Sequence, residues 1–346
     1  MSSSYVFPIT LDGLARSYRL HIPPAAASGK PLPLVLNLHG ATQNAQLEEI
    51  TSGMDPTADH EAFLVTYPNG TRISKVPTPD SVAKQARYGW NAGKSCGLPV
   101  ARLIDDVGFL LKVISDVASL TPVDLRRNHV TGISNGGMMA CAMAGEGSNH
   151  AAAISSVAGQ VELPSIRPTR LVPTTESHNV NDPIAMWNGV PNRDPRLRFS
   201  VIEGIDLWVR SDGCRPSPHD GTTIVGAPDS ISAGEWATRV AHTPCRSGVE
   251  VVLWRLTRSG QVRPGSTLNT GPPSRRILAG PGRGTLLLLL LLLVVDADDA
   301  IWQFFRRCSL PSPSTTHAHS APVLHASQSR PRSDRPGVNP MRRRPS

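Results

Sequence analysis

The sequence predicts an α/β fold in which a central, mostly parallel sheet carries helices on both faces. Short apolar runs, typical of buried parallel strands, occupy residues 34–38, 62–67 and 250–256. Residues 103–117 place apolar side chains at helical spacing and begin with acidic residues, as a helix start favours. Residues 128–140 predict a strand, a tight turn and a helix in direct succession. Alternation of strands with helices is the pattern of an α/β sheet.

The turn within residues 128–140 is the most informative feature of the chain. It reads Gly132, Ser134 and Gly136 at alternate positions, between a β-branched strand and a helix. A sharp strand-to-helix turn strains the central residue and needs very small neighbours on either side. Such a pattern also arises by chance in glycine-containing loops, but the flanking strand and helix favour a nucleophile elbow. We therefore predict Ser134 as a nucleophile, with the amide of Asn135 facing a developing oxyanion.

The other elements follow from composition and periodicity. Residues 15–23 alternate polar and apolar, which predicts a half-buried edge strand. The small residues of 151–158 suit a strand beside the nucleophile. Residues 170–175 predict the next strand and 176–183 the loop after it, whereas residues 190–235 have weak periodicity and predict no element.

The loop after the strand at 34–38 lies where a second oxyanion amide is expected, so Ala41 or Thr42 is assigned that role. His39, at the start of the loop, is interpreted as a structural histidine that hydrogen-bonds the loop. Asp105 and Asp106 could resemble a metal or acid–base pair, but their place at a helix start favours capping.

Composition favours an ordered body and a basic tail. The chain has 346 residues, 39% of them hydrophobic and 18% charged, and a net charge of +8. Residues 309–346 contain six arginines and one acid, which accounts for +5 of that charge, and no basic face with interleaved aromatics occurs elsewhere. We predict one domain over residues 5–307, a disordered tail over 308–346, and no nucleic-acid partner. The apolar run at 286–295 is too short to span a membrane.

The cysteines give little support for a metal site. Five are present without a CxxC pair, so no zinc site, and no metal or organic cofactor, is predicted. Cys214 and Cys245 could form a disulfide if the protein is exported. The N-terminus lacks the basic start and apolar run of a signal peptide, which predicts a cytoplasmic protein if the start is as written.

Several motifs together identify a family resemblance. In order they are residues 16–20 (RSYRL), 38–43 (LHGATQ), 67–70 (YPNG), 90–93 (WNAG), 105–109 (DDVGF) and 132–139 (GISNGGMM). This succession resembles poly(3-hydroxybutyrate) depolymerase-like and feruloyl esterase-like α/β-hydrolases over residues 12–265 and 294–307. The resemblance implies an α/β-hydrolase fold and a serine esterase, usually secreted, that acts on polyesters or on acyl groups of plant polysaccharides.

The resemblance also implies a triad in the order serine, acid, histidine. Residues 178–182 match the acid loop except at Asn179, so Asp182 is assigned as the acid and His178 as its structural neighbour. The histidine position is occupied by Gln261, and a glutamine side chain cannot accept a proton from Ser134 at neutral pH.

Other histidines do not convincingly replace the base. His242 and His219 lie upstream of the expected loop, and the remaining distant ones lie in the tail. The sequence therefore predicts an ester hydrolase that is impaired at the base. The alternative is a catalytically dead hydrolase-fold protein that binds esters or glycans.

Overall fold

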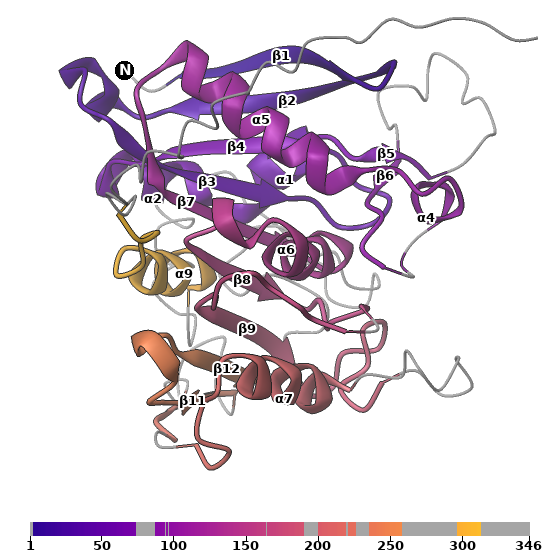
Figure 1. The fold of residues 1–346 in the computed structure, drawn as a ribbon, viewed down its shortest axis with the longest axis vertical. Helices are drawn as coiled ribbons and strands as arrows, with labels where there is room; N and C mark the ends of the chain where they lie inside the picture. The colour runs from indigo at the N-terminus through magenta and orange to yellow at the C-terminus, as the bar shows by residue number, and fades with distance from the viewer. Residues whose placement is uncertain are drawn as a thin grey trace, which may run out of the picture. The chain divides into compact units, whose positions relative to one another are not determined.

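The computed structural model describes residues 3–73, 87–93, 95, 97–163, 165–189, 200–218, 221–225, 235–257 and 296–312. Gln261, His219, the leucine run and residues 313–346 of the predicted tail lie outside these residues. The first residues of the predicted tail are ordered, because Cys308 N donates to Phe305 O and Leu310 N donates to Arg126 O. Described residues up to Pro311 belong to one compact unit built around a large twisted sheet (Figure 1).

The described strands form a ten-stranded sheet in the order β1-β2-β4-β3-β7-β8-β9-β12-β11-β10. Neighbours from β4 to β12 are parallel, whereas the strands outside them pair antiparallel. The prediction of a mostly parallel central sheet is confirmed. The parallel strands are β4 (Leu64–Pro68), β3 (Leu32–Leu38), β7 (Val123–Ile133), β8 (Ala153–Val157), β9 (Thr174–Asn179) and β12 (Val251–Leu256).

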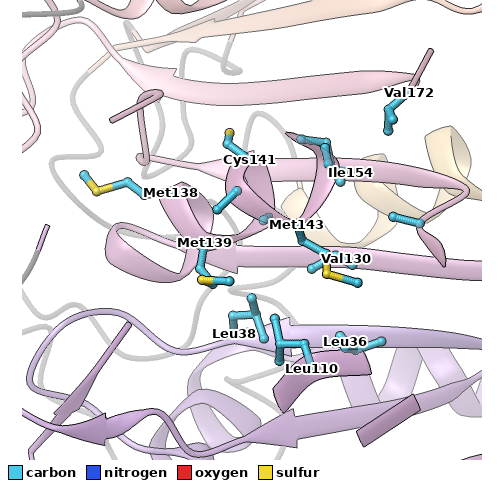
Figure 2. Close-up of a cluster of buried hydrophobic side chains, with 14 of the residues drawn as sticks. Leu36, Leu38, Leu110, Val130, Met138, Met139, Cys141, Met143, Ile154 and Val172 are labelled. Carbon is cyan, nitrogen blue, oxygen red and sulfur yellow. The ribbon is translucent and has the colours of Figure 1, made fainter. Parts of the chain in front are cut away.

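Helices cover both faces of the sheet (Figure 1). The described helices are α1 (Ala45–Ser52), α2 (Met54–Glu61), α4 (Leu98–Ala101), α5 (Asp106–Leu120), α6 (Asn135–Glu146), α7 (Val201–Ser211) and α9 (Ala297–Phe305). Alternate residues of β3 divide the core between the faces, because successive strand side chains point in opposite directions. Leu34, Leu36 and Leu38 join the cluster under α5, α6 and α7, whereas Val35 joins the cluster under α1, α2 and α9. Figure 2 shows the α6 side of the core, where methionines of the helix meet leucines of β3 and α5.

The N-terminal strands correct one prediction. Residues 15–23 were expected at the edge, but β2 (Leu14–Ile22) lies between β4 and β1 (Ser3–Leu11), which forms the edge. β1 is mostly exposed and contains Pro8, which an edge strand tolerates. β1 was not predicted from the sequence, because its hydrophobic pattern is weak.

The strand predicted at 170–175 and the loop predicted from residue 176 are also wrong. The strand is β9, and it runs on to Asn179. Its six residues, TTESHN, are polar yet all buried, because their side chains find partners inside the protein. Hydropathy therefore placed the strand too early.

The region 190–235 contains structure that its composition concealed. Helix α7 begins with a capping box in which Ser200 and Glu203 bond each other's backbone amides. Strands β10 (Thr223–Val225) and β11 (Trp236–His242) complete the second edge. Cys214 and Cys245 form a disulfide that joins the end of α7 to the chain between β11 and β12.

The remaining described elements are short. Strands β5 (Thr71–Arg72) and β6 (Tyr88–Gly89) pair antiparallel, and 3₁₀ turns occur at η1 (Pro24–Ser28), η2 (Ser148–His150) and η4 (Arg246–Gly248). A search of the described helices finds none with the length and apolar character of a membrane span.

Candidate active site

Ser134 lies at the turn between β7 and α6. Its backbone has φ +55° and ψ −122°, a conformation that a non-glycine residue adopts only under strain. Two hydrogen bonds hold it there: the Ser134 amide donates to Val157 O at 2.7 Å, and Ser134 O accepts from Met138 N at 2.9 Å. The local geometry is that of a nucleophile elbow.

The glycines beside the serine are required by close backbone contacts. A Cβ on Gly132 would lie 2.6 Å from the carbonyl oxygen of Leu38, and one on Gly136 would lie 2.1 Å from the same oxygen. The end of β3 thus presses against the elbow. The predicted steric reason for the Gly-x-Ser-x-Gly spacing agrees with these contacts.

The segment after β3 forms a turn beside the elbow. Gln43 N donates to Gly40 O at 3.2 Å, and Gln43 Oε1 accepts from Gly40 N at 2.8 Å. The Thr42 amide, at φ +67°, donates to Tyr88 O at 2.8 Å, which occupies it. Of the two predicted oxyanion donors, only Ala41 therefore has an amide that is not bonded to the described backbone.

His39 is a neutral structural histidine, as predicted. Its Nδ1 donates to Gly40 O at 2.8 Å, and its Nε2 accepts from Gly70 N at 3.0 Å. An acceptor Nε2 requires the neutral ring, and burial accordingly lowers the pKa of His39 to about 4. His39 fixes the turn after β3, and both of its ring nitrogens are engaged in hydrogen bonds.

Asn135, the first residue of α6, hydrogen-bonds a neighbouring loop through its side chain. Its Oδ1 accepts from Trp90 N at 2.7 Å, and its Nδ2 donates to Ser95 O at 3.1 Å. Trp90 in turn donates its indole N–H to His39 O at 2.9 Å. The residue after the nucleophile and the turn after β3 are thus held by the same loop.

A buried ion pair stabilises the loop that contains Trp90. Arg16 Nη1 lies 2.7 Å from Asp106 Oδ1, and its guanidinium lies 3.3 Å from the ring centre of Phe109. Asp106 Oδ2 accepts from Asn91 N at 2.7 Å. Asp105 caps α5 by accepting from Gly108 N, as predicted, whereas Asp106 has the additional role of an internal ion pair.

Asp182 lies in the loop that follows β9. Its Oδ1 accepts from Ile184 N at 2.8 Å and from Ala185 N at 2.9 Å. Its Oδ2 is buried, has no hydrogen-bond partner among the described residues, and lies 3.8 Å from His178 Nε2. Burial raises the pKa of Asp182, while the amide bonds and the charge of His178 oppose that rise.

The strand register brings these segments to one edge of the sheet. Leu38 of β3 pairs with Gly132 of β7, and Asn179 of β9 pairs with Leu256 of β12. Since β7, β8 and β9 are parallel and in register, the elbow, the oxyanion turn and the Asp182 loop all leave from the same ends. The chain that leaves β12 there leads to Gln261, which lies outside the described residues.

His242 lies at the opposite edge. It pairs with Val251 at the start of β12, and its Nδ1 lies 3.3 Å from Arg215 O. It therefore cannot reach an elbow at the other end of the strands, in agreement with its rejection on sequence grounds.

The structure also shows contacts that the sequence did not predict. The side chain of Asn135 bonds Trp90, and Glu176, to which the sequence assigned no role, bonds His178 beside the Asp182 loop. Periodicity could not find them, because each involves a polar residue within a buried element. Only the co-occurrence of short motifs pointed to Trp90 and Asn135. Among described His, Cys, Asp and Glu side chains, no group of three or more could hold a metal ion.

No family model matches the chain. "Putative esterase NocK" of Nocardia uniformis subsp. tsuyamanensis is 28% identical over 282 residues, which cover 76% of this chain and 75% of that protein. "Feruloyl esterase D" of Neurospora crassa is 23% identical over 70% of this chain and 72% of its own length. "Bifunctional acetylxylan esterase/xylanase XynS20E" of Neocallimastix patriciarum is 24% identical over 72% of this chain but only 31% of its own length.

Among solved structures, the acetyl xylan esterase from Aspergillus awamori superposes with a TM-score of 0.50 at 14% identity, over 75% of this chain and 94% of that one. This likeness concerns the fold. The sheet, the elbow and the structural neighbours define an α/β-hydrolase fold. Within that class the chain resembles esterases, which confirms the resemblance inferred from its motifs.

Proposed function

We propose that the chain is a carboxylic-ester hydrolase that works through an acyl-serine intermediate. Ser134 attacks the ester carbonyl, and the amides of Asn135 and Ala41 bind the oxyanion. Asp182 orients the base and stabilises its positive charge. The observation that carries the proposal is the strained conformation of Ser134 at the edge where the Asp182 loop also begins.

The general base is the group that this mechanism lacks. With Gln261 in the histidine position, no imidazole takes the proton of Ser134, and general-base catalysis is worth roughly 10²–10⁴-fold. The chain as written is therefore an impaired esterase.

The substrate follows from resemblance. The motifs favour the polyhydroxybutyrate depolymerase type, and two relatives are named for acetylxylan and feruloyl esters. An ester of a polyester or of a polysaccharide-linked acyl group is the proposed substrate class. The Cys214–Cys245 disulfide favours an oxidising compartment and hence an extracellular protein.

Hydrolysis of p-nitrophenyl acetate tests the mechanism on four proteins: the chain as written, Ser134→Ala, Gln261→His and the double variant. We expect slow turnover for the chain as written, at least a hundredfold gain in Gln261→His, and no turnover once Ser134 is removed. Full activity of the parent that still depends on Ser134 would show that another group is the base. Equal rates with and without Ser134 would exclude acyl-serine chemistry.

Gln261 also favours a second function, that of a dead hydrolase that binds esters or glycans. Isothermal titration of feruloylated and acetylated xylan oligosaccharides, with and without Ser134→Ala, distinguishes the two. Binding without turnover in both the parent and Gln261→His supports the binding protein.

A further inference from the structure

His178 is held between two oxygen acceptors inside the protein. Its Nδ1 lies 2.8 Å from Glu176 Oε1 and its Nε2 lies 2.7 Å from Ala185 O. The ring is fully buried, and the edge of Trp187 packs against it. Both ring nitrogens are therefore engaged at ordinary hydrogen-bond distances.

The proton count of this arrangement favours a charged ring. A backbone carbonyl can only accept, so Nε2 must carry a hydrogen. Burial raises the pKa of Glu176, while its bond to His178 and the charge of that ring oppose the rise. When Glu176 is ionised it only accepts, so Nδ1 must carry the second hydrogen, and the ring is then an imidazolium. Burial lowers the pKa of His178, but its bond to Glu176 and the charge of that group outweigh burial and leave the pKa raised.

The same ring connects to Asp182 through one residue, Ala185. Ala185 donates its amide to Asp182 Oδ1 and accepts from His178 Nε2 at its carbonyl oxygen. The second carboxylate oxygen, Oδ2, lies 3.8 Å from that Nε2. His178 thus fixes the turn that orients Asp182 and places a positive charge beside a carboxylate that burial would otherwise tend to protonate.

We propose that His178 is a positioning residue of the esterase: a buried imidazolium, paired with Glu176, that orients Asp182 and keeps it ionised for the triad. This inference rests on the proposed function, since it assigns the support of the triad acid. His178 itself is not the base, because both of its ring nitrogens already donate hydrogen bonds, one to Glu176 and one to the carbonyl oxygen of Ala185.

The charged and titratable groups around the ring come from three elements. Glu176 shares β9 with His178, and Asp182 belongs to the following loop. From β12, Arg255 pairs in register with His178 and lies 5.6 Å from the ring centre of Trp187. From α6, the Cys141 thiol faces Glu176, which together with burial raises the pKa of that thiol. Two carboxylates thus face one imidazolium, an arrangement that favours its charge.

Two NMR measurements on the full chain test the proposal without relying on turnover. The ¹⁵N signals of His178, assigned by their loss in His178→Gln, are expected to show two protonated nitrogens at neutral pH. The ¹³Cγ signal of Asp182, assigned with Asp182→Asn, is expected to titrate at higher pH in His178→Gln, with at least a tenfold shift in the ionisation equilibrium. Glutamine keeps a donor for Ala185 O but removes the charge.

Matched variants separate charge from folding. His150→Gln, at an exposed histidine, should leave the Asp182 titration unchanged. If His178→Gln fails to fold, Glu176→Gln serves instead, and its His178 should lose the second proton at neutral pH. In the Gln261→His background, His178→Gln should move the acid limb of kcat/KM upward while KM stays near its parent value.

A neutral His178 ring at pH 7, with the proton on Glu176, would overturn the proposal. An unshifted Asp182 titration in His178→Gln would overturn the positioning role as well. These failures leave the dependence of turnover on Ser134 untouched. Conversely, loss of the acyl-serine mechanism would leave the two NMR results unchanged, so the two hypotheses fail separately.

Discussion

Buried His129 predicts that the protein loses stability in mild acid. The ring belongs to β7, is fully buried, and has no hydrogen-bond partner at either nitrogen among the described residues. It stacks on Phe305 of α9 at 4.6 Å between ring centres, with the edge of Trp302 at 6.4 Å. Burial, and secondly the charge of Arg127, lower its pKa to about 3.

The direction in which stability changes with pH follows from proton linkage. The unfolded chain, with an ordinary histidine pKa of about 6.5, binds the proton at a higher pH than the folded chain does. The contribution of the neutral His129 ring to the free energy of unfolding is therefore complete above about pH 6.5. It is lost as the pH falls from there toward about pH 3. Between about pH 7 and about pH 5 the loss is roughly 2 kcal/mol, a large part of a typical stability of about 5–15 kcal/mol.

Urea unfolding at about pH 7 and about pH 5 measures this loss in the parent, in His129→Leu and in His150→Leu, an exposed control. The parent and the control should lose about 2 kcal/mol more than His129→Leu over this interval. His39 and the carboxylates titrate in all three proteins, so they cancel in the comparison. The reasoning fails if the free energy of unfolding of His129→Leu falls as steeply as that of the parent.

Three further predictions concern the elbow, its support and the disulfide. Gly136→Ala should abolish esterase turnover and lower the thermal midpoint, because its Cβ would meet a backbone carbonyl at 2.1 Å; an unchanged midpoint would contradict this. Asn135→Ala should lower the free energy of unfolding in urea by about 1–3 kcal/mol, because Trp90 N loses its acceptor; a loss in Asn135→Asp equal to that in Asn135→Ala would argue against the acceptor. Cys214→Ala with Cys245→Ala should lose about 2–5 kcal/mol, and reductant should then have no further effect on the variant.

Part of the parallel centre of the sheet could be predicted because β3 and β4 are nearly continuous apolar runs. β3 and β4 are buried on both faces, so their hydropathy alone identifies them. β9 is buried to the same degree but carries Glu176 and His178, whose mutual bond replaces hydration. A strand that satisfies its polar side chains internally has no hydropathic signal.

The elbow could be predicted for a different reason: the steric limits on Gly132 and Gly136 are local and leave a motif. The hydrogen bonds that support the site could not be predicted from the sequence. The bond between Asn135 and Trp90 joins residues 45 positions apart, and nothing in either segment alone indicates it. The role of Gln261 stays a prediction, because it lies outside the described residues.

The scattered motifs nevertheless have one physical explanation. Each supplies a member of a single hydrogen-bonded support beneath the elbow and the oxyanion turn. Arg16 donates to Asn69 O and pairs with Asp106, which in turn holds the backbone beside Trp90. Trp90 then bonds His39 O with its indole and Asn135 with its amide.

Such a support must be complete to be favourable, since a buried polar group without its partner costs about 1–3 kcal/mol. This requirement gives a physical reason for the motifs to occur together, and it predicts that a single substitution among them lowers stability. The bonds named here join residues that the structure describes, and Gln261 lies outside them. We therefore expect Gln261→His to restore turnover without a change in these bonds.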